Sequence, residues 1–211
     1  MSNRIAVIDY GAGNLLNVMN AFTVCKANVE VIDSHSDLLL YDKVVLPGVG
    51  AFHEAMNSLQ EKNLIPEILN FINSGRPYLG ICLGMKFLFD KSNEFMDTSG
   101  FSAILGEVTK IPTTTFTNTL RRVPHIGWSP LNVYKENTCP LFNNINEDDS
   151  FYFVHSYMCE PSNEKDVSAS VDYLGQKIVA AISRKNVFGT QFHPEKSGKS
   201  GLKIIENFIK L

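Results

Sequence analysis

The amino-acid sequence predicts an α/β fold: a single domain over residues 1–211, with a mainly parallel sheet flanked by helices and additional antiparallel strands in the C-terminal half. Three observations support this prediction. Short runs rich in Val and Ile alternate with stretches of helical period up to about residue 91. From about 101 to 190, strand-like runs follow one another closely. No repeat with a period of about 20 to 50 residues and no long Pro/Gly/Ser linker divides the chain.

The first half of the chain alternates between strand and helix. Apolar β-branched runs bounded by turn residues predict strands at 5–10, 29–33, 43–47 and 77–81. Apolar residues recur three or four positions apart, which predicts helices at 14–26, 51–60, 64–73 and 83–91. Since the connections are short, we expect parallel strands with helices on both faces of the sheet.

The second half is mostly strand. Apolar and aromatic runs at 151–156, 177–183 and 187–192 predict strands, and their close spacing favours antiparallel or edge pairing. The last eleven residues, 201–211, form an amphipathic pattern that predicts a closing helix. Its apolar residues three or four positions apart are Leu202, Ile205, Phe208 and Ile209.

Composition excludes several classes of function. Hydrophobic residues are 44% and charged residues 19% of the chain, as in soluble globular proteins. The net charge of −3 gives no general attraction for nucleic acid or for an anionic membrane. No apolar run approaches the roughly 18 residues of a membrane helix, and the first residues lack the pattern of a secretory signal. We therefore expect a cytoplasmic protein without nucleic-acid or membrane partners.

The cysteines give no metal or disulfide pattern. Cys25, Cys82, Cys139 and Cys159 include no C-x-x-C pair and have no histidine at zinc-finger spacing. We expect no metal site and no cofactor. Ligands of sheets of this kind bind beyond the carboxyl ends of the strands. Four predicted strand ends carry unusual residues: DYGAGN at 9–14, LPGVGAF at 46–52, GICLGMK at 80–86 and TQFHPEKS at 190–197.

Cys82 is the candidate nucleophile. It lies in G-I-C-L-G between a predicted strand and a predicted helix, and the glycines allow the crowded turn of a nucleophile elbow. A thiol at a helix N-terminus has a lowered pKa and a larger thiolate fraction. Because a lone G-x-C-x-G recurs by chance, a small buried cysteine is an equally good interpretation of this segment alone.

His193 is the candidate base, and Glu195 the residue that orients it. Pro194 turns the chain out of a strand, which lets the imidazole and the carboxylate lie side by side. Together with Cys82 they would form a Cys-His-Glu triad. His193 alone favours a structural, hydrogen-bonded histidine, and only the combination with Pro194, Glu195 and the elbow favours catalysis.

A tetrahedral intermediate also needs hydrogen-bond donors for its oxygen. Backbone amides of Gly48, Val49 and Gly50, just after a predicted strand, can serve as donors, with the Leu83 amide as a second source. The alternative interpretation of P-G-V-G is a tight turn without a functional role. The segment lacks the third glycine and the downstream acidic residue of a dinucleotide fingerprint.

GICLGMKFLF, QFHPEKS and LPGVGAF, in an α/β pattern, make the chain resemble the class I, triad-type glutamine amidotransferases over nearly its whole length. VPHIGW at 123–128, YFVHSY at 152–157 and DYGAGN are similar to segments of the glutaminase subunits of imidazole glycerol phosphate synthases. The resemblance implies hydrolysis of glutamine to glutamate and ammonia by the Cys82 triad. It also implies a heterodimer with a (β/α)₈ barrel cyclase, which receives the ammonia and forms imidazole glycerol phosphate in histidine biosynthesis.

The resemblance also implies roles for single residues. Gly48, Val49 and Gly50 would belong to the oxyanion strand, and Ser156 and Tyr157 would hold the α-amino and carboxylate groups of glutamine. The expected contacts with the partner are Asn14, Pro124, Ile126, Trp128 and Lys196. Without the resemblance, Trp128 is slightly better explained as a core residue than as an interface residue.

The histidines outside the triad have weaker signals. His155 lies in an aromatic run, which favours a structural role or a contact with substrate over a second catalytic base. We expect His53 and His125 to be ordinary structural residues.

Lys86 departs from the family pattern, which has glutamine at this position. Its ammonium can pair with the α-carboxylate of glutamine, but it can equally weaken binding or mark a subunit that supplies ammonia for the amidination of a cell-surface sugar. Ile126 and Ser129 also depart slightly from the usual P-H-M-G-W-N. Three competing interpretations come from different classes of protein: a partner-independent cysteine hydrolase, a catalytically silent binding subunit, and the glutaminase of another synthase, such as that for anthranilate or guanylate.

Overall fold

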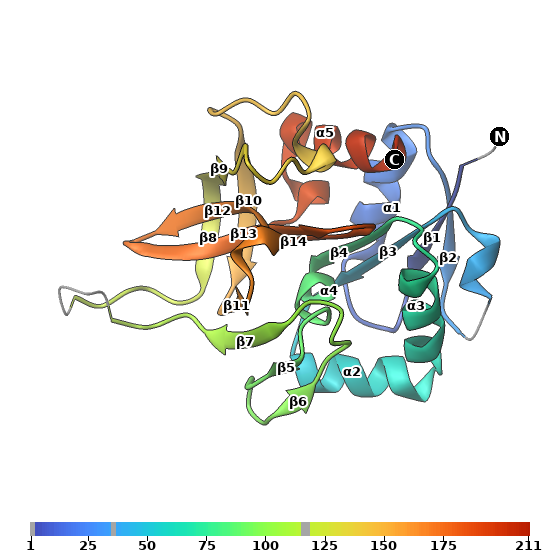
Figure 1. Ribbon diagram of the computed structural model, residues 1–211, viewed down its shortest axis with the longest axis horizontal. Coiled ribbons are helices and arrows are strands. Elements are labelled where there is room, and N and C mark those ends of the chain that lie inside the picture. Colours follow the sequence, from blue (N-terminus) through green and yellow to red (C-terminus); the bar gives the residue numbers. More distant parts are fainter. Residues whose placement is uncertain (1–2, 35–36, 115–118) are drawn as a thin grey trace.

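An eight-stranded sheet in the order β2-β1-β3-β4-β14-β13-β12-β9 is the centre of the computed structural model, which describes residues 3–34, 37–114 and 119–211 (Figure 1). The parallel strands are β2 (Asn28–Ile32), β1 (Arg4–Ile8), β3 (Lys43–Gly48), β4 (Tyr78–Cys82) and β14 (Val187–Thr190). The antiparallel extension contains β13 (Gln176–Arg184), β12 (Val167–Tyr173) and β9 (Asn132–Val133). The predicted fold class is confirmed.

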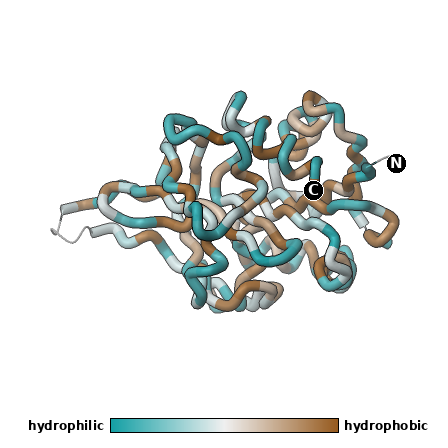
Figure 2. Tube along the Cα trace, turned by 45° about the horizontal axis from the view of Figure 1, so that its top comes forward, coloured by the Kyte–Doolittle hydropathy of each residue, from teal (hydrophilic) through white to brown (hydrophobic). Residues whose placement is uncertain are grey.

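The central strands are apolar on both faces because helices cover both. In β1, Ile5 and Val7 belong to one buried core and Ala6 and Ile8 to the other. Figure 1 shows α1 (Leu15–Val24) and α5 (Gly198–Ile209) on one side, and α2 (Phe52–Glu61) and α3 (Leu64–Asn73) on the other. Hydrophobic and hydrophilic residues alternate along much of the chain trace in Figure 2. None of the helices in the described ranges has the length and hydrophobicity needed to cross a membrane.

Two smaller sheets and four 3₁₀ helices complete the described part of the fold. One sheet pairs β8 (His125–Pro130) with β10 (Ser150–His155), and the other has the order β11-β7-β5-β6, with β11 (Tyr157–Pro161), β7 (Gly106–Lys110), β5 (Lys91–Ser92) and β6 (Thr98–Ser99). Only Ser156 separates β10 from β11, so the chain passes directly from one small sheet to the other. The 3₁₀ helices are η1 (Leu38–Leu40), η2 (Pro140–Phe142), η3 (Glu164–Asp166) and η4 (Pro194–Lys196).

The helix predicted over 83–91 is much shorter in the structure. Helix α4 covers only Leu83–Lys86. The carbonyl groups of Phe87, Leu88 and Phe89 accept hydrogen bonds from amides of residues 101–104 rather than from the next helical turn. All three side chains are fully buried, so a helix with one solvent-facing side does not form here. The prediction was wrong because tertiary hydrogen bonds replaced the helical ones.

The parallel register brings the unusual strand ends to one edge of the sheet. Gly48 at the end of β3 pairs with Cys82 at the end of β4, and Thr190 at the end of β14 pairs with Ile81 on the other side of β4. The segments that follow β3, β4 and β14 therefore meet around Cys82, as the rule for ligand sites in such sheets requires.

Candidate active site

Cys82 occupies a strained elbow between β4 and α4. Its φ of 54° and ψ of −101° lie in a region that L-residues rarely adopt. The flanking glycines are required by packing, because a Cβ at Gly80 would clash with the Gly84 carbonyl and a Cβ at Gly84 would clash with the Leu46 carbonyl. The side chain of Cys82 is 5% exposed. Residues 80–84 thus form the nucleophile elbow that the sequence predicts.

His193 and Glu195 lie side by side, with His193 next to Cys82. His193 Nδ1 and Glu195 Oε1 are 2.7 Å apart, and each side chain is 2% exposed. Pro194 starts η4, and the Ser197 hydroxyl donates to the His193 carbonyl at 2.6 Å, which holds the turn. The buried His193 Nε2 makes no hydrogen bond of normal geometry with the described residues. Free catalytic sites often have such a loose contact between base and nucleophile.

The charges of the triad favour a thiolate–imidazolium pair. Burial alone would raise the pKa of Cys82, but the attraction of His193, and then of Lys86, lowers it below its usual value. Burial would lower the pKa of His193, but the thiolate of Cys82 and the Glu195 carboxylate raise it to about 10. The sequence suggested that a helix dipole lowers the pKa of Cys82. Because α4 is only a single turn, the charges of neighbouring side chains lower this pKa instead.

A cavity of about 340 Å³ opens beside Cys82. It collects most of the residues predicted for the oxyanion and substrate sites. Its lining consists of Val49, Gly50, Cys82, Leu83, Lys86, Glu94, Pro124, Val154, His155, Ser156 and Tyr157. Gly48 lies just outside it, where a Cβ would clash with the Tyr10 hydroxyl and lie 2.9 Å from Leu83 Cβ.

Lys86 and Glu94 carry opposite charges on the wall of this cavity. Lys86 is 6% exposed, and no carboxylate in the described part of the chain pairs with its ammonium. Glu94 is 9% exposed, and its Oε2 accepts a hydrogen bond from the Phe52 amide at 3.0 Å. Sequence analysis missed Glu94, because nothing in its loop distinguishes it from a surface carboxylate.

The residues predicted for the partner surface fall into two groups. Ile126 and Trp128 are 58% and 56% exposed on the outer face of β8, so the interpretation of Trp128 as a core residue is wrong. Trp128 and Lys196 contact the same side chain, Tyr152, whose ring centroid lies 6.0 Å from that of Trp128 and 5.9 Å from Lys196 Nζ. Sequence analysis did not single out Tyr152, the residue that links Trp128 and Lys196.

The second group lies apart from this exposed pair. Pro124 lines the cavity beside Cys82. Asn14 caps α1, and its side chain accepts a hydrogen bond from the Asn17 amide at 3.4 Å.

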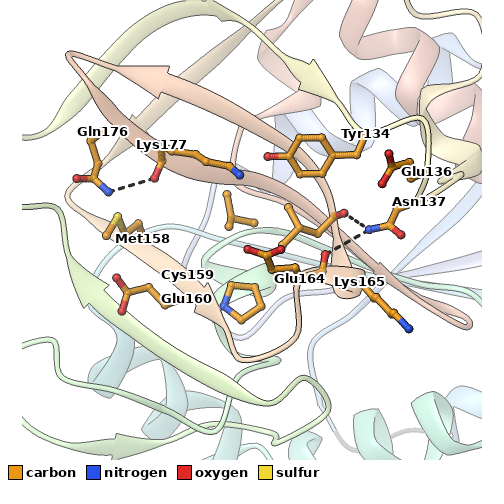
Figure 3. A pocket seen from close by; sticks show the side chains of 13 residues that line it. Tyr134, Glu136, Asn137, Met158, Cys159, Glu160, Glu164, Lys165, Gln176 and Lys177 are labelled. Atoms are coloured by element: carbon orange, nitrogen blue, oxygen red, sulfur yellow. Dashed lines mark hydrogen bonds between the residues drawn. The ribbon is translucent and has the colours of Figure 1, made fainter.

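A second cavity of about 530 Å³ lies among β11, β13 and η3 and shares no lining residue with the first (Figure 3). In it Lys177 Nζ lies 5.1 Å from the centroid of the Tyr134 ring. Cys159 belongs to its lining, but burial raises the pKa of this thiol to about 12. The four cysteines are all free thiols, and only Cys82 has a lowered pKa.

Comparison with known proteins gives consistent results. The family model of class I glutamine amidotransferases matches residues 6–211. The chain is 43% identical to "Imidazole glycerol phosphate synthase subunit HisH 1" of Legionella pneumophila (strain Paris), over 99% of this chain and 100% of the relative. It is 42% identical to the protein with the same name in Methanococcus maripaludis, over 98% and 99% of the two chains. The solved structure of PurLQS from Thermotoga maritima has a TM-score of 0.77 at 18% identity, covering 100% of this chain and 99% of that one, which shows a shared fold.

Proposed function

Because the chain belongs to the class I glutamine amidotransferases, and within them to the HisH subunits of imidazole glycerol phosphate synthase, we propose that Cys82, His193 and Glu195 hydrolyse glutamine to glutamate and ammonia for histidine biosynthesis. One observation carries the proposal: a thiol of lowered pKa faces a cavity whose wall bears a buried ammonium group and a carboxylate. The γ-carboxamide and the zwitterionic end of glutamine match these two features.

The substrate is held at its amino-acid end. Lys86 pairs with the α-carboxylate of glutamine, and Glu94 accepts hydrogen bonds from its α-ammonium group. Ser156 and Tyr157, with His155 beside them, line the wall at the junction of β10 and β11. Holding both charges directs the carboxamide toward Cys82, which converts binding energy into orientation of the reacting groups.

The reaction is a two-step acyl transfer. The Cys82 thiolate attacks the carboxamide carbon, and the oxygen of the tetrahedral intermediate takes up the negative charge. The His193 imidazolium then gives its proton to the nitrogen, the C–N bond breaks, and ammonia leaves a glutamyl thioester. Neutral His193 next takes a proton from water, and the hydroxide attacks the thioester. The C–S bond breaks, glutamate leaves, and the Cys82 thiolate is regenerated. Glu195 orients the imidazole and stabilises its cation throughout.

Backbone amides stabilise the oxyanion. Those of Val49 and Gly50 on one side, and of Leu83 on the other, belong to residues that line the cavity beside Cys82. Loss of one such donor costs on the order of 10² to 10³ in rate. Gly48, which starts this segment, has no room for a side chain.

The ammonia is used by a partner. The word "subunit" in the relatives' names supports an assembly with a second chain. We infer that this chain is a (β/α)₈ barrel cyclase that docks on Ile126, Trp128 and Lys196 and also contacts Asn14 and Pro124. We also infer that the segment 47–50 aligns its amides only when the partner carries its own ligand, which prevents wasteful hydrolysis of glutamine.

The test is release of glutamate by the chain alone, with the cyclase, and with the cyclase plus its nucleotide substrate. We expect the rate to rise at each addition and to vanish in Cys82→Ser. Equal rates under all three conditions would contradict the coupling to the partner. Activity that survives in Cys82→Ser would contradict the assignment of the nucleophile.

A further inference from the structure

Two buried histidines that the catalytic mechanism does not use are paired between β8 and β10. His125 and His155 occupy opposite positions of the two antiparallel strands and are 1% and 5% exposed. His125 Nδ1 lies 3.2 Å from His155 Nε2. His155 lines the cavity beside Cys82, whereas His125 is not among its lining residues and lies on β8, the strand that carries Trp128.

The chemistry of the end groups determines the direction of every hydrogen bond in this cluster. His155 Nδ1 lies 2.9 Å from the Tyr157 carbonyl, which can only accept, so Nδ1 carries the proton. In a neutral ring Nε2 is then an acceptor, and His125 Nδ1 must donate to it. His125 Nε2 is consequently an acceptor as well, and the Ser129 hydroxyl at 3.2 Å donates to it.

Both rings are held neutral and in place by their surroundings. Burial lowers the pKa of His125 to about 4. Burial, and then the nearby charge of Lys86, lower the pKa of His155 well below its usual value. The ring of His125 is stacked between Phe153 and Tyr173, with centroids 4.7 Å and 4.1 Å away, so it is fixed in orientation.

The cluster joins two surfaces with different roles. Side chains of β8 alternate between the two faces of the strand, so His125 and Ser129 point inward while Ile126 and Trp128 point to solvent. At the inner end, the Tyr157 carbonyl belongs to the junction of β10 and β11 that lines the cavity. Three consecutive hydrogen bonds therefore connect Ser129 to the cavity wall, and the one between His125 and His155 crosses from β8 to β10.

We propose that Ser129, His125 and His155 form a directed hydrogen-bond relay, in which Ser129 and His125 are positioning residues that tie the partner-facing strand β8 to the substrate-binding turn 155–157. This inference rests on the proposed function for the nature of the two surfaces. It predicts that the relay affects the binding of glutamine more than the chemistry at Cys82, because none of its side chains bonds to the triad, whose members lie at the end of β4 and at η4.

The tautomers are tested directly by ¹⁵N NMR of the histidine side chains in the isolated protein near pH 7. We expect both His125 and His155 to be neutral with the proton on Nδ1. A proton on Nε2 of either ring, or a cationic ring, would overturn the relay. This measurement does not require glutaminase activity, so it stands even where the proposed function fails.

Substitution tests the link to substrate in the complex with the cyclase. His125→Phe keeps the stacking but removes both hydrogen bonds, and we expect KM for glutamine to rise about tenfold with kcat changed less, as loss of a buried hydrogen bond implies. His125→Asn, which retains a donor near the Nδ1 position, should recover most of the affinity. Ser129→Ala should reduce the stimulation by the partner. His53→Asn is the control, since His53 bonds to Thr98 and Asn57 outside the cavity.

The outcomes separate the two proposals. If the wild-type complex releases no glutamate, the proposed function is wrong. If it does so and His125→Phe, folded by its thermal melt, has an unchanged KM, the relay is wrong. Equal loss in His125→Phe and His125→Asn would also overturn it, because a general packing defect would not distinguish the two variants.

Discussion

The reactivity of Cys82 depends on three neighbouring charged groups rather than on the thiol alone. His193 and Lys86 lower the pKa of Cys82, and Glu195 opposes them. Burial strengthens the effect of each of these charges, because charges are weakly screened in a buried site. Single substitutions in this group should therefore change the titration of the thiol in a predictable direction.

His193→Gln should shift the alkylation of Cys82 to higher pH. In the wild type the folded pKa of Cys82 lies below 9.0, so the thiolate persists until the pH falls through this lowered value. Without the imidazolium, burial raises the pKa, and at neutral pH the thiolate fraction falls about tenfold for each unit. The rate of iodoacetamide labelling at Cys82, located by mass spectrometry, measures the shift. Cys159, whose pKa is already raised to about 12, is the internal control. An unchanged profile would contradict the ion pair.

Lys86→Met should weaken binding of glutamine and stabilise the free protein at the same time. The buried ammonium has no carboxylate partner in the described part of the chain, so its removal relieves an unpaired buried charge. Loss of its contact with the α-carboxylate should raise KM at least tenfold, from a charged hydrogen bond of about 1.5–3 kcal/mol. Thermal melts test the expected gain in stability, and measurements of KM test the expected loss of affinity for glutamine. A lower melting temperature with unchanged KM would assign Lys86 a structural role only.

The segment after β3 is held between two other elements. The Tyr10 hydroxyl and Leu83 of α4 both lie against Gly48, and Gly13 approaches the backbone of Gly48. The Tyr10 hydroxyl is buried and has no hydrogen-bond partner among the described residues. Burial and the charge of Cys82 raise its pKa, so it stays protonated. The Tyr10 hydroxyl and the Leu83 Cβ methylene therefore leave no room for a side chain at Gly48.

Gly48→Ala should abolish most glutaminase activity, and Tyr10→Phe should partly restore it. The new Cβ would overlap the Tyr10 hydroxyl, but without that oxygen the nearest ring atom, Cζ, is 3.4 Å away. Recovery is partial because Leu83 Cβ remains at 2.9 Å. Tyr10→Phe alone should be neutral or stabilising by about 1 kcal/mol, since an unsatisfied buried hydroxyl is costly. Activities and unfolding curves of the three variants form a double-mutant cycle, and strict additivity would contradict the contact.

At the scale of the whole molecule, the edge of the sheet that carries Cys82 lies beside the strand pair β8–β10. The carboxyl ends of β3, β4 and β14 form this edge, where we propose that catalysis takes place. The strands β8 and β10 stand next to it and carry Trp128 and Tyr152 outward. The Tyr152 carbonyl accepts a hydrogen bond from the His193 amide at 2.9 Å, so this surface also reaches the base of the triad.

Trp128→Ala should leave the free protein intact but weaken its assembly with the cyclase. The indole is 56% exposed, so its removal should change the free energy of unfolding by less than about 1 kcal/mol. A central aromatic residue at an interface contributes about 2 kcal/mol or more, which corresponds to at least a roughly thirtyfold loss of affinity. Titration calorimetry with the cyclase measures the loss. Phe95→Ala is the matched control, because Phe95 is 83% exposed on the loop between β5 and β6. Equal effects would contradict a docking surface at Trp128.

The sequence by itself determined the fold class, the elbow at Cys82 and the adjacency of His193 and Glu195. These features are encoded locally: the strands by apolar runs, the elbow by its glycines and the His–Glu contact by Pro194. For the same reason the helix over 83–91 was overestimated, since distant amides took over its hydrogen bonds.

Only the tertiary structure decided which polar residues, far apart in the sequence, lie close together. Glu94 faces the same cavity as Lys86, and His125 pairs with His155, although 30 residues separate the two histidines. The exposure of Trp128 likewise follows from which face of β8 packs on the body of the protein. Strand register and the packing of sheets set these contacts, and a one-residue change of register would move every such side chain to the opposite face.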